Sequence, residues 1–172
     1  MWILSILITL VNGDYFSPEQ VHLAWADDLT SMSVTWASMF SSYGSSIQYT
    51  PISSHSESVN SYLFSSEASW ASYPNKASKG LMQRHLYVCK GYMINLIPGQ
   101  LYAYRVGSNM FGWSKNFSFK ARRNFTDADT ARFLIYGDLS AGEENIPTIS
   151  RLNLETYNYE YDAVIHNGDF MI

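Results

Sequence analysis

The chain has 172 residues, of which 47% are hydrophobic and 16% aromatic, so it can bury one good core and part of a second. Its formal net charge is −4 and its basic residues form no stripe, which argues against nucleic acid or an anionic membrane surface as a partner. Cys89 is the single cysteine, so no internal disulfide can form, although a disulfide to another subunit stays open.

The N-terminus carries a short apolar run from Trp2 to Val11, with Val11 and Gly13 at the −3 and −1 positions of a cleavage site. The run is shorter than the about 20 residues of a transmembrane helix, so we expect no membrane span. Residues 1–13 are therefore predicted to be a secretory signal peptide, leading to the extracellular space or the lysosomal lumen. A positively charged start is missing apart from the terminal amine, and a buried first strand is the alternative.

Residues 18–122 have the pattern of an all-β domain. Apolar residues alternate with others from Val21 to Trp25 and from Met32 to Trp36, and this period of two places each set on one face of a strand. The serine-rich stretch from Ser53 to Ser66 is expected to form a loop or the edge of a sheet. About seven short strands without a helix predict a β-sandwich of roughly 100 residues, so the fold class is mainly β.

The most specific local pattern in this half is a corner that begins at Leu96. Pro98 and Gly99 make the turn, and Tyr102 and Tyr104 then share one face of the next strand. A tyrosine just after such a corner typically hydrogen-bonds back across it. The pattern resembles the corner of fibronectin type III domains.

Two sequons for N-glycosylation follow, beginning at Asn116 and Asn124. They agree with secretion without proving it. Phe117 and Phe119 are expected to face inward on a last strand, while Asn116 and Ser118 face outward. A glycan on Asn116 is therefore sterically reasonable.

Two apolar runs of strand length end in glycine-aspartate pairs, Gly137-Asp138 and Gly168-Asp169. Neither run alternates with polar residues, which is typical of parallel strands buried on both faces. Between the runs, a helix is expected to start near Pro147, with Ile149 and Leu152 following at helical spacing and Thr156 as a further candidate. The sequence therefore predicts a β-α-β unit with parallel strands.

Such a unit would place Asp138 and Asp169 at the carboxyl ends of neighbouring strands, where open α/β sheets bind ligands. Carboxylates held about 5 Å apart repel each other unless a cation lies between them. A pair of metal ions that clamps both oxygens of a displacement at phosphorus is the usual solution. A glycine before each aspartate would let the backbone turn sharply. A simple turn that binds nothing is the alternative for each pair taken alone.

Residues Arg132 to Phe170 resemble the first two motifs of the purple acid phosphatases, Gly-Asp-x-Gly and Gly-Asp-Phe-Ala-Tyr, and the segment before them resembles the fibronectin-like N-terminal domain of that family. The resemblance implies a β-sandwich at 18–122 and the incomplete start of a calcineurin-like metallophosphoesterase domain at 131–172. It implies that Asp138 binds iron. Asp169 would bridge the iron to a second divalent metal, which is zinc, manganese or iron.

The chain departs from the family pattern at three positions. Ser140 stands where the family has its second glycine, and Met171-Ile172 stand where it has Ala-Tyr. Ile172 thus occupies the position of the tyrosinate ligand, so no purple charge-transfer band is expected. The family's later histidine motifs would lie beyond residue 172. No catalytic residue is therefore expected within this chain, which alone should bind metal weakly and hydrolyse nothing at a useful rate.

The resemblance implies the N-terminal part of a secreted dinuclear-metal acid phosphatase, which hydrolyses phosphate monoesters at acidic pH and could form a homodimer. The alternative is a secreted, non-catalytic β-sandwich that serves as an interaction module and keeps a vestigial catalytic segment. Trp70 and Trp113 are candidates for an exposed docking surface, with core or dimer contacts as the other interpretation.

Overall fold

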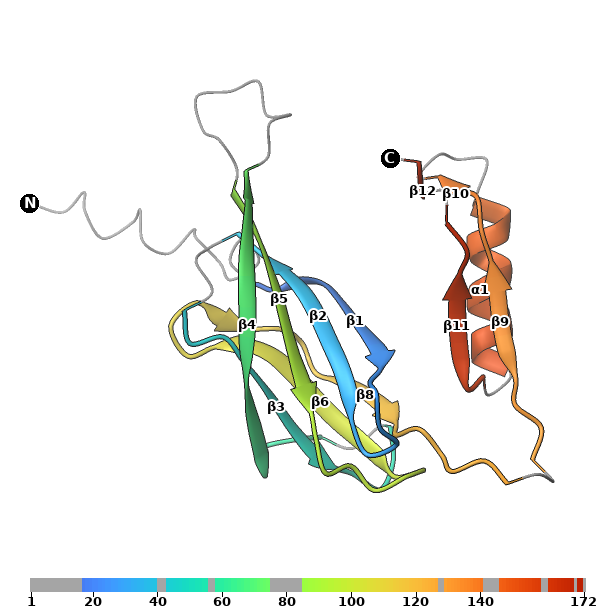
Figure 1. Ribbon diagram of the computed structural model, residues 1–172, viewed down its shortest axis with the longest axis horizontal. Coiled ribbons are helices and arrows are strands. Elements are labelled where there is room, and N and C mark those ends of the chain that lie inside the picture. Colours follow the sequence, from blue (N-terminus) through green and yellow to red (C-terminus); the bar gives the residue numbers. More distant parts are fainter. Residues whose placement is uncertain are drawn as a thin grey trace, which may run out of the picture. The chain divides into compact units, whose positions relative to one another are not determined.

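The computed structural model describes residues 17–39, 43–55, 58–74, 85–126, 129–140, 146–158, 161–168 and 170–171. The chain divides into two compact units, Met1–Asn124 and Phe125–Ile172 (Figure 1). The predicted signal peptide at 1–13 lies outside the described residues.

The first unit is a β-sandwich whose two antiparallel sheets share one strand, β4. One sheet has the order β1-β2-β5-β4, and the other has the order β4-β3-β6, with β7 and β8 both paired to β6. The strands are β1 Glu19–Trp25, β2 Met32–Ser38, β3 Ser46–Pro51, β4 Phe64–Pro74, β5 His85–Met93, β6 Leu101–Ser108, β7 Gly112–Trp113 and β8 Phe117–Lys120. The predicted β-sandwich is confirmed. The stretch expected to be a loop or an edge up to Ser66 gives way to β4 already at Phe64.

The alternation in the sequence produces the core between the two sheets. Val34 and Trp36 of β2 are 0% and 1% exposed, and Ile47 of β3 is fully buried. The phenol ring of Tyr104 in β6 packs edge-on against Phe119 at 5.6 Å between centroids. Burial raises the pKa of the Tyr104 phenol to about 12, because the charged form is penalised by desolvation. The Tyr104 phenol is therefore neutral, and it adds no charge to the core.

The corner before β6 is fixed by Tyr102. Its side chain is buried, and its hydroxyl accepts a hydrogen bond from the N–H of Ile97 at 3.1 Å. Gly99 adopts a φ of 77° in the turn and donates its N–H to the carbonyl of Ala121 at 3.1 Å. The predicted tyrosine corner is confirmed, and it joins the turn to the end of the sandwich.

Replacing Tyr102 by phenylalanine is expected to lower the free energy of unfolding by about 1–2 kcal/mol, because the N–H of Ile97 loses its acceptor in a part-buried place. Urea denaturation followed by circular dichroism measures this change. Tyr43→Phe is the control, since Tyr43 is 74% exposed. Equal stabilities of the two variants would contradict the role given to the corner.

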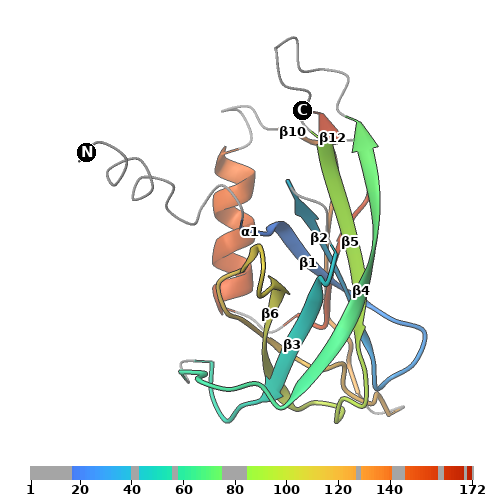
Figure 2. The ribbon, with the colours of Figure 1, turned by 90° about the vertical axis from the view of Figure 1, so that its left-hand side faces the viewer.

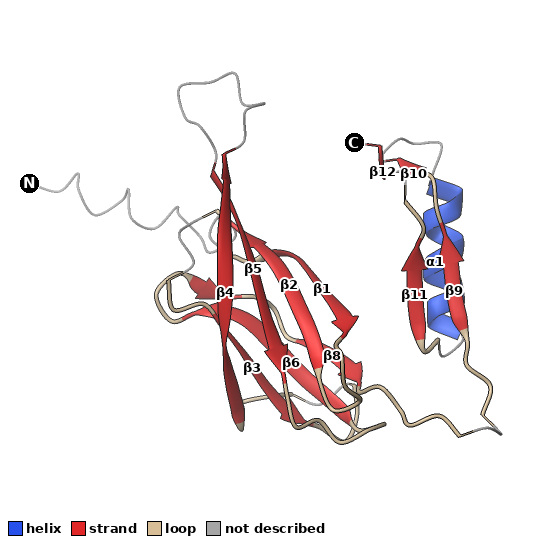
Figure 3. Ribbon diagram, viewed as in Figure 1, coloured by secondary structure: helices blue, strands red, loops and turns tan. Residues whose placement is uncertain are grey.

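The second unit contains the predicted β-α-β arrangement, made of β9 Phe133–Tyr136, α1 Ile146–Asn158 and β11 Ala163–His166. Strands β9 and β11 are paired in parallel, with Phe133 opposite Ala163 and Tyr136 opposite His166. A second parallel pair follows, in which β10 Leu139–Ser140 lies beside β12 Phe170–Met171. Figure 3 shows α1 running alongside β9 and β11. The expected parallel pairing is therefore confirmed.

Candidate metal centre

The starts of the two parallel strands are tied together by Arg132 and Asp162. The N–H of Asp162 donates to the carbonyl of Arg132 at 2.8 Å, and the N–H of Arg132 donates to the carboxylate Oδ2 of Asp162, also at 2.8 Å. These two hydrogen bonds between Arg132 and Asp162, called the clamp below, fix the register of β9 and β11, in which Phe133 lies opposite Ala163. Asp162 is not among the predicted site residues, although a carboxylate directly before a strand is a usable signal for a hydrogen bond to a neighbouring backbone N–H.

The expected helix is confirmed as α1, but most of its residues are exposed. Leu152 and Glu155 are half-buried, whereas Ile149 is 40% exposed and Thr156 is also exposed. The Thr156 hydroxyl donates to the Leu152 carbonyl at 3.0 Å, which satisfies it locally. Of the three residues expected at helical spacing, Leu152 is thus half-buried, and Ile149 and Thr156 are exposed.

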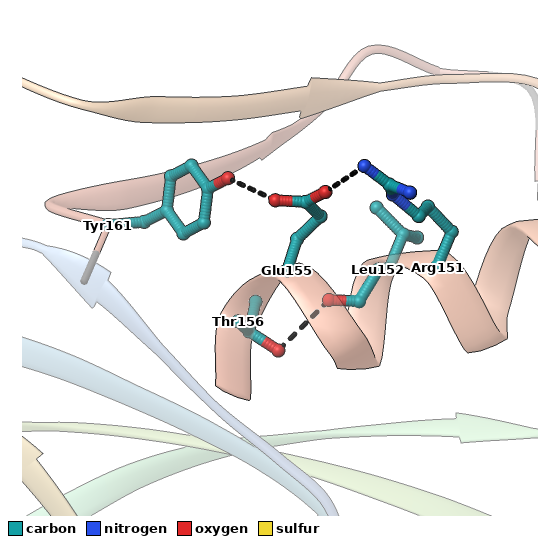
Figure 4. Close-up of polar contacts among 5 residues, drawn as sticks. All are labelled: Arg151, Leu152, Glu155, Thr156 and Tyr161. Atoms are coloured by element: carbon teal, nitrogen blue, oxygen red, sulfur yellow. Dashed lines mark hydrogen bonds and ion pairs between the residues drawn. The ribbon is translucent and has the colours of Figure 1, made fainter. Parts of the chain in front are cut away.

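Glu155 joins the helix to the segment that leads into β11. Its carboxylate forms an ion pair with Arg151 one turn earlier and accepts a hydrogen bond from the Tyr161 hydroxyl at 3.2 Å (Figure 4). Because Tyr161 directly precedes Asp162, these contacts hold the helix against the same end of the strands as the clamp. The polar contacts thus fix the end of the unit that lies opposite the two glycine-aspartate pairs.

The carboxyl ends of β9 and β11 stay in contact beyond the last paired residues. The N–H of Asn167 donates to the Tyr136 carbonyl at 2.7 Å, and the N–H of Asp138 donates to the Gly168 carbonyl at 3.2 Å. Asp138 has a φ of 53°, in the left-handed region that aspartate tolerates better than most residues, and it is exposed. The structure therefore brings Asp138 beside Gly168, the residue before Asp169, while Asp169 and Ile172 lie outside the described residues.

Gly137 is required by close packing and not by a turn. Its φ is not in the left-handed region, which is occupied here by Asp138 and by Gly168 at 75°. A Cβ on Gly137 would lie 3.0 Å from the carbonyl oxygen of Asn167. The expected turn is seen at Gly168, which has a positive φ, whereas at Gly137 the missing side chain leaves room for the carbonyl of Asn167.

Replacing Gly137 by alanine is expected to push the two loops apart and to cost about 1–3 kcal/mol of local stability, as overpacking does elsewhere. Faster amide hydrogen exchange at Asp138 and Asn167, whose N–H groups bridge the loops, measures the change. Gly44→Ala is the contrasting variant, because a Cβ there meets nothing within 4 Å although the φ of 71° is strained for alanine, and it should leave exchange at Asp138 and Asn167 unchanged. Unchanged exchange at both amides would contradict the packing role.

The described part of the chain contains no complete metal site. Among the described residues there is no group of three histidine, cysteine, aspartate or glutamate side chains that could hold a metal ion. Asp138 offers one exposed carboxylate, a donor that suits iron and divalent cations. His166 is half-buried, and its ring packs edge-on against Tyr136 at 4.9 Å between centroids, as a residue packed within the sheet does. The donor set fits a metal only as the first part of a larger ligand shell.

The two sequons lie at the end of the sandwich. Phe119 is buried, Phe117 is half-buried and Ser118 is exposed, so the expected inward and outward faces of this strand are confirmed. Asn116 is exposed, and its Oδ1 accepts a hydrogen bond from the Tyr62 hydroxyl at 2.6 Å. Asn124 is exposed as well. Both asparagines are accessible for modification, which itself stays a prediction.

None of the helices in the described ranges is both long and apolar enough to cross a membrane. Residues 18–121 match the protein-family model described as "Purple acid Phosphatase, N-terminal domain". This match covers the sandwich and ends at its last strand.

Two curated relatives extend the similarity into the second unit. Acid phosphatase type 7 of Homo sapiens is 32% identical over 154 residues, which are 90% of this chain and 32% of that protein. Acid phosphatase type 7 of Danio rerio is 34% identical over 157 residues, which are 89% of this chain and 32% of that protein. The chain therefore spans about a third of the length of these relatives.

Among solved structures, the purple acid phosphatase PPD1 isolated from yellow lupin (Lupinus luteus) seeds has a TM-score of 0.57 to this chain. The similarity covers 76% of this chain and 24% of that chain, with 20% sequence identity. At this identity the likeness supports the fold alone.

Proposed function

The chain belongs to the purple acid phosphatase family, and on this premise we propose that it forms the N-terminal part of a dinuclear-metal hydrolase of phosphate monoesters that acts at acidic pH. Residues 18–122 form its N-terminal β-sandwich, and residues 131–172 begin its metallophosphoesterase domain. The bond between the Asp138 N–H and the Gly168 carbonyl is the observation that carries the proposal, because it holds the two glycine-aspartate loops together at the edge of the parallel pair.

The proposed roles are those that the resemblance to the family implies for the two aspartates, and the contact between Asp138 and Gly168 supports them. Asp138 would hold iron, and Asp169 would be shared between the iron and a second divalent metal, which is zinc, manganese or iron. When bound, such a pair of metal ions clamps the oxygens of an in-line displacement at phosphorus. The two carboxylates would hold the metals and partly neutralise their charge, and the close approach of Gly137 to Asn167 would keep the two loops in contact.

The 172-residue chain alone is proposed to be inactive. Two aspartates cannot fill the coordination shells of two metal ions, so binding to this chain is weak. Ile172 stands at the position of the tyrosinate ligand and its hydrocarbon side chain offers no phenolate oxygen, which predicts a protein without the purple colour.

The proposed location is the extracellular space or the lysosomal lumen. The apolar leader at 1–13 and the two exposed sequon asparagines, Asn116 and Asn124, support passage through the secretory pathway. The partner proposed for the site is a phosphomonoester, with neither nucleic acid nor a membrane span involved. A homodimer is the proposed assembly.

The proposal is tested with the full-length protein, meaning the longest chain that the gene encodes, purified from a secretory host. We expect hydrolysis of p-nitrophenyl phosphate at acidic pH, loss of activity after chelation and recovery when iron and zinc are restored. The 172-residue chain, prepared in parallel, should show none of this activity. A full-length protein without metal-dependent phosphatase activity would contradict the proposed function.

A second candidate is the non-catalytic interaction module, and the exposed apolar face of the second unit favours it. Phe133, Ile135 and Ile165 lie on one face of the parallel pair and are 43%, 62% and 45% exposed. A β-α-β unit with such a face buries little apolar surface of its own, whereas the sandwich has a complete core.

Limited proteolysis of the 172-residue chain separates the two candidates. If the glycine-aspartate loops are metal ligands, zinc or iron should slow cleavage between residues 131 and 168 several-fold, because the metal binds the folded unit. Asp138→Asn should remove this protection and leave the sandwich resistant. Cleavage after Arg123 at the same rate with and without metal would favour the interaction module.

A further inference from the structure

The second half of β4 has a strand on only one of its sides. Residues Ala68 to Pro74 pair with β5, whereas β3 pairs only with the first half of β4, up to Glu67. The last contact on the β3 side is the N–H of Ala68, which donates to the Ser45 carbonyl at 2.9 Å. Figure 2 shows this half of β4 on the outer side of β5. No described strand pairs with this edge beyond Ala68.

The backbone groups that this edge offers can be identified. The Ala68 N–H points away from β5, and residues two apart in a strand point to the same side. Trp70 and Ser72 therefore direct their N–H and C=O groups outward, away from β5. Together they form a row of donors and acceptors of the kind that another strand can pair with.

The side chains along the edge do little to prevent such pairing. No charged residue occurs between Ala68 and Tyr73, and Pro74 blocks only the end of the strand. Trp70 is 39% exposed and lies in an aromatic row, 5.7 Å from the Tyr43 ring and 5.6 Å from the Tyr87 ring between centroids. The edge is thus long, uncharged and bordered by exposed aromatic surface.

We propose that this edge joins two copies of the chain, through antiparallel pairing of β4 with β4 of the second copy about a twofold axis at Ala71. Trp70 then exchanges backbone hydrogen bonds with Ser72 of the second copy, and Ser72 does the same with Trp70 of the second copy. An antiparallel edge is self-complementary about such an axis, as a twofold interface requires. The inference names the interface of the homodimer proposed above and is independent of the metal site.

The residues at the axis fit this arrangement. Ala71 lies opposite Ala71 of the second copy, and the two form a non-hydrogen-bonded pair. The Cα atoms of such a pair lie about 4.5 Å apart, so a small side chain is needed at this position. Because the edge carries no charge from Ala68 to Tyr73, no like charges meet across it. The pairing of so few residues buries less than the about 1,200 Å² of standard interfaces, so the dimer should dissociate on dilution.

Analytical ultracentrifugation of the 172-residue chain, from micromolar to near-millimolar concentration, tests the proposal. We expect a monomer at low and a dimer at high concentration. Ala71→Lys places two like charges against each other at the axis and should weaken association at least about tenfold. Ser72→Pro should do the same, because it removes an outward N–H and leaves the bonds to β5 intact. Ser58→Lys, which adds the same charge in an exposed loop, should leave association unchanged.

Circular dichroism of each variant establishes that it is folded before association is compared. A wild-type chain that stays monomeric over the whole range would overturn the proposal. So would association that survives both Ala71→Lys and Ser72→Pro but is lost in Ile135→Lys, since that result places the contact on the apolar face of the second unit.

Discussion

Asp138→Asn in the full-length protein is expected to lower kcat/KM for a phosphomonoester by more than about 100-fold. Loss of a residue that only supports a metal ligand typically costs 10–100-fold, and loss of a ligand should cost at least as much. Asparagine keeps the size of the side chain and tolerates the φ of 53° as well as aspartate does, so the loop should keep its shape. The change therefore tests the carboxylate charge and not the fold.

The measurement is steady-state hydrolysis at acidic pH with saturating metal. The matched control is Asp27→Asn, which makes the same chemical change at an exposed turn of the sandwich and should leave kcat/KM unchanged. Equal activity of the Asp138→Asn variant and the wild type would remove Asp138 from the proposed ligands.

Trp36→Ala is expected to lower the free energy of unfolding of the sandwich by about 3–5 kcal/mol, the usual cost of removing a buried aromatic ring. Trp36 is 1% exposed and lies opposite Cys89, which is also fully buried. Small domains are stable by only about 5–15 kcal/mol, so this one change should leave the sandwich marginal.

Guanidinium denaturation followed by circular dichroism measures the loss. Trp36→Phe is the matched variant, because it keeps most of the ring volume and removes an indole N–H that has no hydrogen-bond partner among the described residues. It should cost less than about 1.5 kcal/mol. A similar cost for the alanine and phenylalanine variants would show that ring volume is not what Trp36 contributes.

Most of the sandwich could be predicted from the sequence because its signals are local. The period of two in β2 predicted that Val34 and Trp36 lie in the core. The turn at Pro98 and Gly99 predicted the hydrogen bond of Tyr102. In contrast, β4 changes partners from β3 to β5 near Ala68. Its serines carry little local preference, and partner exchange depends on contacts distant in sequence, so this strand could not be predicted.

The candidate metal centre was predictable in outline for a similar reason. Two apolar runs that end in glycine-aspartate pairs indicated parallel strands, and β9 and β11 are paired in that way. The close packing at Gly137 was not predictable, because it depends on the carbonyl oxygen of Asn167, which follows the other strand of the pair. The sequence also could not predict which of Ile149 and Leu152 is the more buried in α1. Both side chains prefer burial equally, and only packing decides between them.

The metal content of the full-length protein tests the central claim most directly, namely that the two glycine-aspartate loops hold a metal pair. Mass spectrometry of the wild type should find a pair of metal ions per chain, including iron. Asp169→Asn removes the proposed bridge and should lose most of both metals, whereas Asp138→Asn should lose chiefly the iron. Full metal content in the Asp169→Asn variant would contradict the account.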